Sequence, residues 1–243
     1  MNKNCFLTLT FDNDNLKVMC PDGSINKKHM QDFMKRVRKK FVVKGDDSTK
    51  LGMYYVGEYG EKSWRPHYHV ILFNCDFEDK EYCGRRNGFK YYKSSLLREL
   101  WPYGNNIIGD VTFESAAYVA RYVTKKITGD KAEEHYKGRV PEFGQASLKP
   151  ALGKNWFLKY GKTDVIPFDE VVVRGFAGKP PRYYDKLFER EDLEGYKLMK
   201  LKRRQRGFND KDSTYQRLQD REYCKILAVK RLVRTLDNLE NVV

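Results

Sequence analysis

Residues 66–73 read Pro-His-Tyr-His-Val-Ile-Leu-Phe, and this run predicts a buried β-strand that carries two histidines on one face. Side chains at positions i and i+2 of a strand point to the same side, so His67 and His69 lie next to each other with Tyr68 between them. Two adjacent imidazoles can bind a divalent metal ion. Two strand histidines can also be simple hydrogen-bonding residues at a sheet surface, and two ligands alone do not define a metal site.

The segment before this strand offers a third ligand. Residues 51–58 predict a second strand, joined to the histidine strand by a short loop, so that the two form a hairpin. Pairing across the hairpin is expected to bring the carboxylate of Glu58 level with His67 or His69. Glu61 is the alternative, although it lies in the turn, where an acid is usually only solvated. Two imidazoles and one carboxylate suit Mg²⁺ or Mn²⁺ when phosphate oxygens and water complete the coordination, and could also take zinc.

A second informative stretch is 116–128, Ala-Ala-Tyr-Val-Ala-Arg-Tyr-Val-Thr-Lys-Lys-Ile-Thr. Its apolar residues recur at spacings of three and four, which predicts a helix. Tyr118 and Tyr122 leave the same side of this helix one turn apart, and Lys125 follows on that side. An amphipathic helix whose tyrosines only border the core would show the same pattern. Paired tyrosines and a lysine also suit DNA cleavage, in which a phenol attacks a phosphodiester, a metal ion polarises the phosphate and a lysine stabilises the developing charge.

Together these motifs resemble the endonucleases that nick single-stranded DNA at rolling-circle origins, the HUH superfamily, named for its His-hydrophobic-His motif. The run 67–69 is similar to that motif, and the run 118–126 is similar to the paired-tyrosine motif of the replication initiators of small single-stranded DNA phages. The strand expected at 5–11 resembles the first motif of these enzymes, which is structural. The resemblance covers about residues 5–128 and is greatest to the replication initiators of microviruses, in particular the gokushovirus branch.

The resemblance implies a replication initiator that nicks and rejoins single-stranded origin DNA through a covalent 5′-phosphotyrosine, leaving a 3′ hydroxyl that primes a polymerase. The implied site has Glu58, His67 and His69 as metal ligands and Mg²⁺ or Mn²⁺ as the metal. The implied catalytic residues are Tyr118, Tyr122 and Lys125. An HUH transposase or relaxase is a related alternative, and a non-catalytic protein that binds single-stranded DNA is an alternative of another class.

Composition agrees with a nucleic-acid partner. The chain has 243 residues, a formal net charge of +14, 17 tyrosines and 14 phenylalanines, which suits a polyanion whose unpaired bases can stack on aromatic rings. From residue 174 onward there are 18 Lys and Arg against 11 Asp and Glu. Most of these charges read as solvated helix faces, but the cluster near 202–206 contains no acid and favours phosphate contact. The residues expected to contact DNA are Arg121, Lys126, Lys202, Arg203, Arg204 and Arg206.

The remaining expectations concern partners and location. The sequence shows no Gly-rich nucleotide-binding loop of the Walker type, so a host helicase is expected to act with this protein and a host polymerase to extend the primer. The five cysteines form no Cys-x-x-Cys pair, which is typical of reduced thiols in a cytoplasm, here that of a bacterial host. No apolar run approaches the roughly 20 residues of a membrane span, so no membrane partner is expected.

The fold expected from these patterns is α+β. The resemblance implies a central antiparallel sheet of about five strands with flanking helices and a basic helical C-terminal extension. Residues 1–150 are expected to form the nicking domain, and residues 151–243 the basic, partly helical extension. The stretch 74–92 reads as a polar connection, and 183–235 as two charged helices that separate near residue 207.

Overall fold

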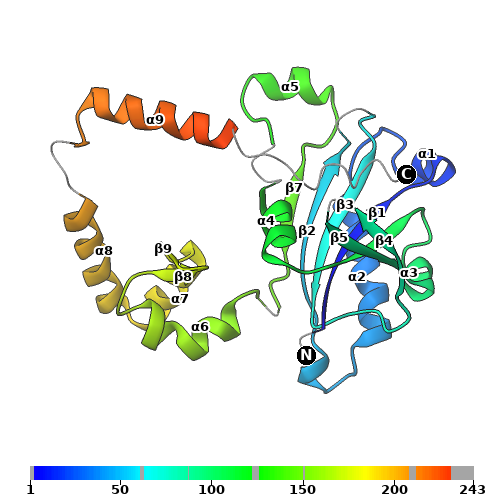
Figure 1. The fold of residues 1–243 in the computed structure, drawn as a ribbon, viewed down its shortest axis with the longest axis horizontal. Coiled ribbons are helices and arrows are strands. Elements are labelled where there is room, and N and C mark those ends of the chain that lie inside the picture. The colour runs from blue at the N-terminus through cyan, green and yellow to red at the C-terminus, as the bar shows by residue number, and fades with distance from the viewer. Residues whose placement is uncertain are drawn as a thin grey trace. The chain divides into compact units, whose positions relative to one another are not determined.

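The computed structural model describes residues 3–60, 63–86, 88–121, 126–149, 151–207 and 212–230. These residues form two compact units, one ending at Leu152 and the other beginning at Gly153. The first unit is an antiparallel sheet flanked by helices, which confirms the expected α+β fold (Figure 1). Among the described residues, no helix combines the length and the apolar character needed to cross a bilayer.

The sheet has seven strands in the order β4-β5-β6-β1-β3-β2-β7, and neighbouring strands are antiparallel. The histidine strand β3 lies between β1 and β2, so its backbone is hydrogen-bonded on both edges. The strands are β1 (Asn4–Thr10), β2 (Gly52–Tyr59), β3 (Pro66–Phe73), β4 (Glu81–Arg86), β5 (Phe89–Lys93), β6 (Asn106–Asp110) and β7 (Phe143–Ala146).

The sheet is larger than the expected five strands. The hairpin of β4 and β5 occupies most of the stretch that reads as a polar connection, and β7 adds a further edge strand. Edge strands carry polar and exposed side chains, so they lack the apolar run that signals a buried strand. A register shift between Tyr82 and Gly84 interrupts the alternation of β4 as well.

One face of the sheet holds the main core. Alternate residues of the central strands, such as Leu7, Leu9, Val70 and Leu72, are fully buried there. They pack against α2 (Lys27–Phe41), whose buried residues include Met30, Phe33, Met34 and Val37 at helical spacing. Two shorter helices complete this face, α1 (Asn13–Met19) and α3 (Ser95–Leu100).

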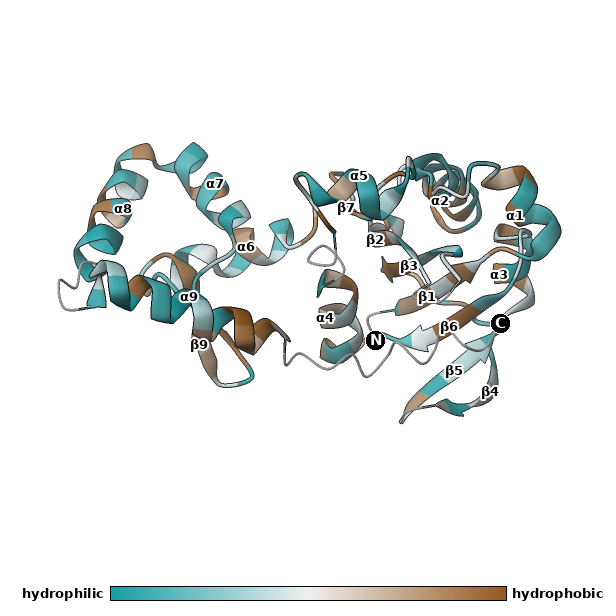
Figure 2. Cartoon of the chain, turned by 90° about the horizontal axis from the view of Figure 1, so that it is seen from above, coloured by the Kyte–Doolittle hydropathy of each residue, from teal (hydrophilic) through white to brown (hydrophobic). Residues whose placement is uncertain are grey.

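The opposite face carries a smaller cluster formed by Phe6, Val56 and Ile71, which α4 (Phe113–Arg121) covers with Tyr118 and Val119. Thus α2 and α4 lie on opposite faces of the sheet (Figure 2). Since strand side chains alternate between faces, the histidines of β3 share the α4 face with Ile71, while Tyr68 points to the α2 face.

The tyrosine helix begins at Phe113, earlier than expected, because Thr112 and Ser115 cap it reciprocally. The hydroxyl of Ser115 accepts from the amide of Thr112 at 2.9 Å, and the hydroxyl of Thr112 accepts from the amide of Ser115 at 3.2 Å. The described part of α4 ends at Arg121, and residues 126–128 are not helical, so the helix does not continue to 128 as expected. The first unit also contains η1 (Asp47–Thr49) and α5 (Lys131–Tyr136).

The second unit has a small core of Phe157, Phe188 and Met199. Where the sequence predicts two charged helices, three are present, because Asp192 ends one helix and its carboxylate accepts from the amide of Gly195 at 2.9 Å at the start of the next. The elements are α6 (Lys154–Tyr160), the π-helix η3 (Gly161–Val165), the hairpin of β8 (Val171–Val173) and β9 (Phe176–Gly178), α7 (Arg182–Glu191), α8 (Leu193–Gly207) and α9 (Tyr215–Lys230).

Candidate functional site

Glu58, His67 and His69 converge on the α4 face of the sheet, and we call them the metal group. The register of β2 and β3 places Glu58 directly opposite His67, and His69 is the next residue of β3 on that face. The Nε2 atom of His67 lies 2.6 Å from Oε1 of Glu58, and the Nε2 atom of His69 lies 3.0 Å from the same oxygen. All three residues are buried, with at most 5% of each exposed.

The second nitrogen of each ring is held by a neighbour. Nδ1 of His67 lies 3.1 Å from the carbonyl oxygen of Arg65, and Nδ1 of His69 lies 3.1 Å from Oγ1 of Thr8. A carbonyl can only accept, so His67 donates from Nδ1 and presents the lone pair of Nε2 toward Glu58. A buried carboxylate that faces two such nitrogens requires positive charge between them, from added protons or from a metal ion.

The donor set fits a metal ion. The ligand atoms of the metal group lie within 4.8 Å of one another. Oε2 of Glu58 is buried and has no hydrogen-bond partner among the residues that the structure describes, although a buried carboxylate oxygen normally has one. Two imidazoles and a carboxylate are a common ligand set for divalent metals. The metal group could therefore hold a metal ion.

Thr8 and Arg65 are site residues that the sequence analysis missed. Thr8 lies on β1 directly opposite His69, which only the strand register reveals. The guanidinium of Arg65 donates to the carbonyl oxygen of Phe11 from Nε at 3.2 Å and to Oδ1 of Asn13 from Nη1 at 2.8 Å. These bonds fix the start of β3 against the end of β1, and so hold the Arg65 carbonyl where it accepts from His67.

Of the three expected catalytic residues, Tyr118 lies beside the metal group. Its ring centroid is 5.3 Å from that of His69, with an interplanar angle of 77°, and Phe6 stacks on the same imidazole at 5.6 Å. Tyr122 and Lys125 lie outside the described residues, as does Glu61, the alternative ligand. Two expected DNA contacts lie near the end of α4. Arg121 donates to the carbonyl of Ala117 at 3.1 Å, and Lys126 is exposed.

Tyr68 and His29 lie on the other side of β3. The hydroxyl of Tyr68 is 2.8 Å from Nδ1 of His29 and accepts from the amide of Asn26 at 2.8 Å. Burial raises the pKa of the Tyr68 phenol, which opposes formation of a phenolate. The middle residue of the motif is therefore an anchor to the start of α2 rather than a nucleophile.

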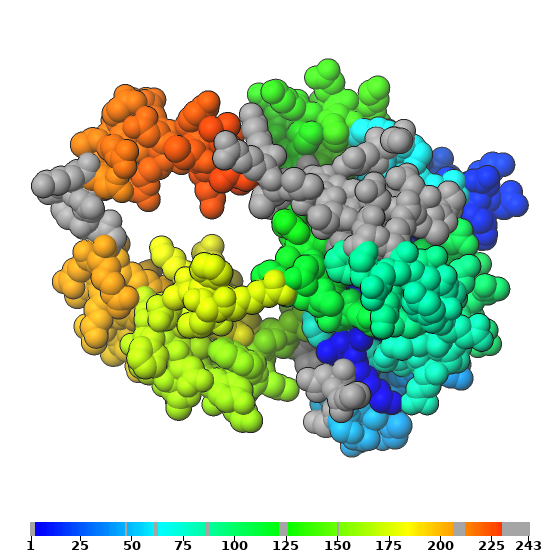
Figure 3. Space-filling view, viewed as in Figure 1, coloured from blue at the N-terminus to red at the C-terminus, as the bar shows by residue number. Residues whose placement is uncertain are grey.

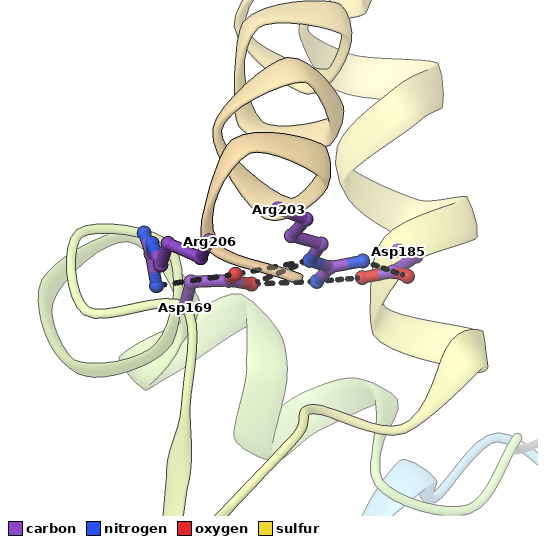
Figure 4. A network of polar contacts seen from close by, with 4 residues as sticks. All are labelled: Asp169, Asp185, Arg203 and Arg206. Carbon is purple, nitrogen blue, oxygen red and sulfur yellow. Dashed lines mark hydrogen bonds and ion pairs between the residues drawn. The ribbon is translucent and has the colours of Figure 1, made fainter. Parts of the chain in front are cut away.

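The cationic cluster of the second unit divides into two kinds of residue. Arg203 is one-quarter exposed and lies between two carboxylates, with Nε 2.9 Å from Oδ1 of Asp169 and Nη1 2.7 Å from Oδ2 of Asp185 (Figure 4). Its bonds to Asp185 and Asp169 raise the pKa of the guanidinium further. Arg206 lies 3.8 Å from Asp169 and is mostly exposed, as are Lys202 and Arg204. Arg203 thus has a structural role, and DNA contact by this cluster stays a prediction.

The fold and the metal group define a class of protein. An antiparallel α+β sheet with a His-hydrophobic-His pair on a central strand, an acidic residue opposite and a tyrosine helix on the same face is the arrangement of HUH proteins. Within that class, residues 4–127 match the model of the replication-associated protein ORF2 family. The chain belongs to this family, and the expected relationship to the replication initiators of microviruses is confirmed.

Three phage proteins illustrate the relationship. The chain is 34% identical to replication-associated protein VP4 of Bdellovibrio phage phiMH2K, over 79% of this chain and 59% of that protein. It is 31% identical to replication-associated protein ORF2 of Spiroplasma virus 4, over 96% of this chain and 76% of that protein. It is 33% identical to replication-associated protein ORF4 of Chlamydia phage 1, over 79% of this chain and 48% of that protein. No solved structure matches the chain.

Proposed function

We propose that this protein initiates DNA replication by nicking and rejoining single-stranded origin DNA through a covalent 5′-phosphotyrosine. The observation that carries the proposal is the contact between the ring of Tyr118 and His69 of the buried metal group. A phenol beside two imidazoles and a carboxylate combines a nucleophile with a site for a divalent cation. Membership in a family of phage replication-associated proteins supports the same role.

In the proposed reaction, the phenol oxygen of one tyrosine forms a bond to the phosphorus of the scissile phosphate while the bond from phosphorus to the 3′ oxygen breaks. The phenol loses its proton and the departing 3′ oxygen gains one, so a 3′ hydroxyl is freed. Rejoining is the reverse reaction. Glu58, His67 and His69 would hold Mg²⁺ or Mn²⁺, which would polarise the phosphate. Tyr122 serves as the second nucleophile, and Lys125 stabilises the developing charge.

The proposed partners follow from the reaction. Arg121 and Lys126 lie at and beyond the end of α4, near Tyr118, where they can contact the phosphates of origin DNA. A host helicase would separate the strands, and a host polymerase would extend the freed 3′ hydroxyl. These partners place the reaction in the cytoplasm of the bacterial host.

The test is capture of the covalent intermediate. The full chain is incubated with Mn²⁺ and single-stranded fragments that tile the phage genome, and peptides of the product are mapped by mass spectrometry. We expect DNA linked to Tyr118 or Tyr122. Tyr118→Phe and Tyr122→Phe should each retain initial nicking and stall after one covalent event, because repeated turnover needs both phenols. The double variant should form no adduct.

Tyr82→Phe is the matched control, because Tyr82 is 60% exposed on β4 and should tolerate the change without loss of activity. An adduct at neither tyrosine of the helix, or nicking by the double variant, would leave both as structural residues. The protein would then fit the non-catalytic alternative.

A further inference from the structure

A groove lies on the α4 face of the sheet, beside the metal group. It encloses about 270 Å³, and its lining includes Phe6, Thr8, Phe89, Tyr91, Ile107 and Gly109. The strand register explains why these residues share one face. Ile107 pairs with Thr8, and Gly109 pairs with both Phe6 and Tyr91. In Figure 3 the surface of the β4–β5 hairpin, drawn in teal, lies beside the green surface around α4.

The groove is continuous with the metal group. Phe6 stacks on the ring of His69 with an interplanar angle of 17°, and Thr8 contacts Nδ1 of the same histidine. Since neighbouring strands lie about 4.8 Å apart, the groove begins one strand away from the histidines. Ser115, three residues before Tyr118 on α4, lines it as well. A strand of DNA with its phosphate at the metal group would pass over this opening.

Gly109 keeps the groove open. Glycine in the interior of a strand weakens it and often marks a place where a ligand or another backbone comes close. The backbone of Gly109 is not in the left-handed region, and an added Cβ atom would meet Cδ1 of Phe6 at 3.4 Å and the carbonyl oxygen of Lys90 at 3.9 Å. These are ordinary contacts, so neither backbone geometry nor a close neighbouring strand requires glycine. A missing side chain here leaves space for a ligand.

The chemistry of the groove selects the ligand. Its walls include aromatic rings of Phe6, Phe89 and Tyr91, which suit the flat face of a base. The hairpin beside it, residues 81–93, contains four basic residues (Arg85, Arg86, Lys90 and Lys93) and one acid, Glu81. This excess of positive charge complements a phosphate backbone. An apolar peptide would use the aromatic walls but not the charge.

We propose that this groove binds one unpaired nucleobase of the DNA strand, next to the phosphate that the metal group receives. The inference rests on the proposed function for its ligand, but its test measures binding and needs no cleavage. Stacking of a base in the groove would fix the strand in register, so the groove would act as a positioning site for the scissile phosphate.

The experiment compares two oligonucleotides of equal length and charge, a thymidine 15-mer and a 15-mer of abasic residues, at one salt concentration and without divalent metal. Gly109→Leu of the full chain fills the groove. We expect this variant to bind the thymidine 15-mer about 5- to 100-fold more weakly than the unaltered protein, the range expected for loss of one stacked base. Binding of the abasic 15-mer should be unchanged, because its phosphates are held by the same cations.

Gly178→Leu is the control, since Gly178 lies on β9 of the second unit and an added Cβ atom has no neighbour within 4 Å. Gly109→Ala, which adds one atom at ordinary contact distance, should show a smaller loss and keeps the test valid if the leucine variant misfolds. An equal loss on both oligonucleotides, or no loss on either, would overturn the inference while leaving the nicking assay unaffected. Absence of a tyrosine adduct with a base-dependent loss at Gly109 would instead refute the proposed function alone.

Discussion

Thr8 and Thr10 leave the same face of β1, yet only Thr8 contacts the metal group. Thr8 lies 3.1 Å from Nδ1 of His69, whereas the hydroxyl of Thr10 donates to the carbonyl of Asn105 at 3.1 Å. Removing a partner that orients a metal-binding histidine typically lowers metal affinity about 10- to 100-fold. We expect Thr8→Val to lower Mn²⁺ affinity about 10-fold and Thr10→Val to leave it unchanged, measured by calorimetry. Equal effects of the two substitutions would mean that Thr8 does not orient His69.

The histidines themselves give a second prediction. His67→Ala and His69→Ala should each abolish cleavage and leave affinity for single-stranded DNA within about two-fold, because phosphate contacts by cations supply most of that affinity. Cleavage is followed on a gel and binding by fluorescence anisotropy. Glu58→Ala should weaken the response to added Mn²⁺ more than Glu61→Ala. The opposite order would move the third ligand into the turn.

His29 predicts a pH dependence of stability. Burial lowers the pKa of its imidazole below the usual value of about 6.5. Below pH 6.5 the unfolded chain therefore binds a proton that the folded chain does not, so this contribution to stability is complete above pH 6.5 and is lost as the pH falls through the lower pKa of the folded state. We expect urea denaturation between pH 7.5 and 5.5 to show a smaller decline for His29→Gln than for the unaltered protein. Equal declines would mean that the protonation of His29 is not linked to folding.

At the scale of elements, the central strands could be predicted from sequence and the edge strands could not. The apolar runs of β1, β2 and β3 and the paired histidines of β3 are local signals, and the hairpin they imply brings Glu58 opposite His67. The contact of Thr8 with His69 depends on pairing between segments 61 residues apart, which no local pattern encodes. The β4–β5 hairpin was missed because it is exposed and irregular, and the break at Asp192 because a single capping residue makes it.

The ion pairs of α8 give an element-scale prediction. Arg203 joins this helix to Asp169 and to Asp185 of α7, whose carboxylates are 8% and 17% exposed. Arg203→Ala would leave two carboxylates without a cation and should lower the free energy of local opening by about 2 kcal/mol, less than for a fully buried pair because the guanidinium is partly solvated. Hydrogen exchange of the α7 amides measures this.

Arg204 is the matched control, since it is exposed on the same helix. Arg204→Ala should change stability by less than about 0.5 kcal/mol. If Arg204 binds a phosphate, its removal should reduce the salt dependence of DNA affinity by about one ion, whereas removal of Arg203 should not. A change in salt dependence for Arg203→Ala without loss of exchange protection would make it a DNA contact.

At the scale of the whole molecule, the metal group, Tyr118 and the groove all belong to the first unit. A chain truncated after Leu152 should therefore still bind Mn²⁺ and form the tyrosine adduct. Its affinity for single-stranded DNA and the salt dependence of that affinity should both fall, because much of the positive charge follows residue 174. A folded truncated chain that forms no adduct would show that the second unit takes part in the chemistry.

The burial of Tyr68 on the α2 face limits how β3 can evolve. Because successive residues alternate between faces, inserting or deleting one residue within this strand would turn both histidines into the core and place Tyr68 beside Glu58. Replacement of a side chain changes one contact, whereas a change of length exchanges the two faces of the strand at once. Natural relatives should therefore differ by substitutions within 52–59 and 66–73, with insertions and deletions confined to loops such as 44–50.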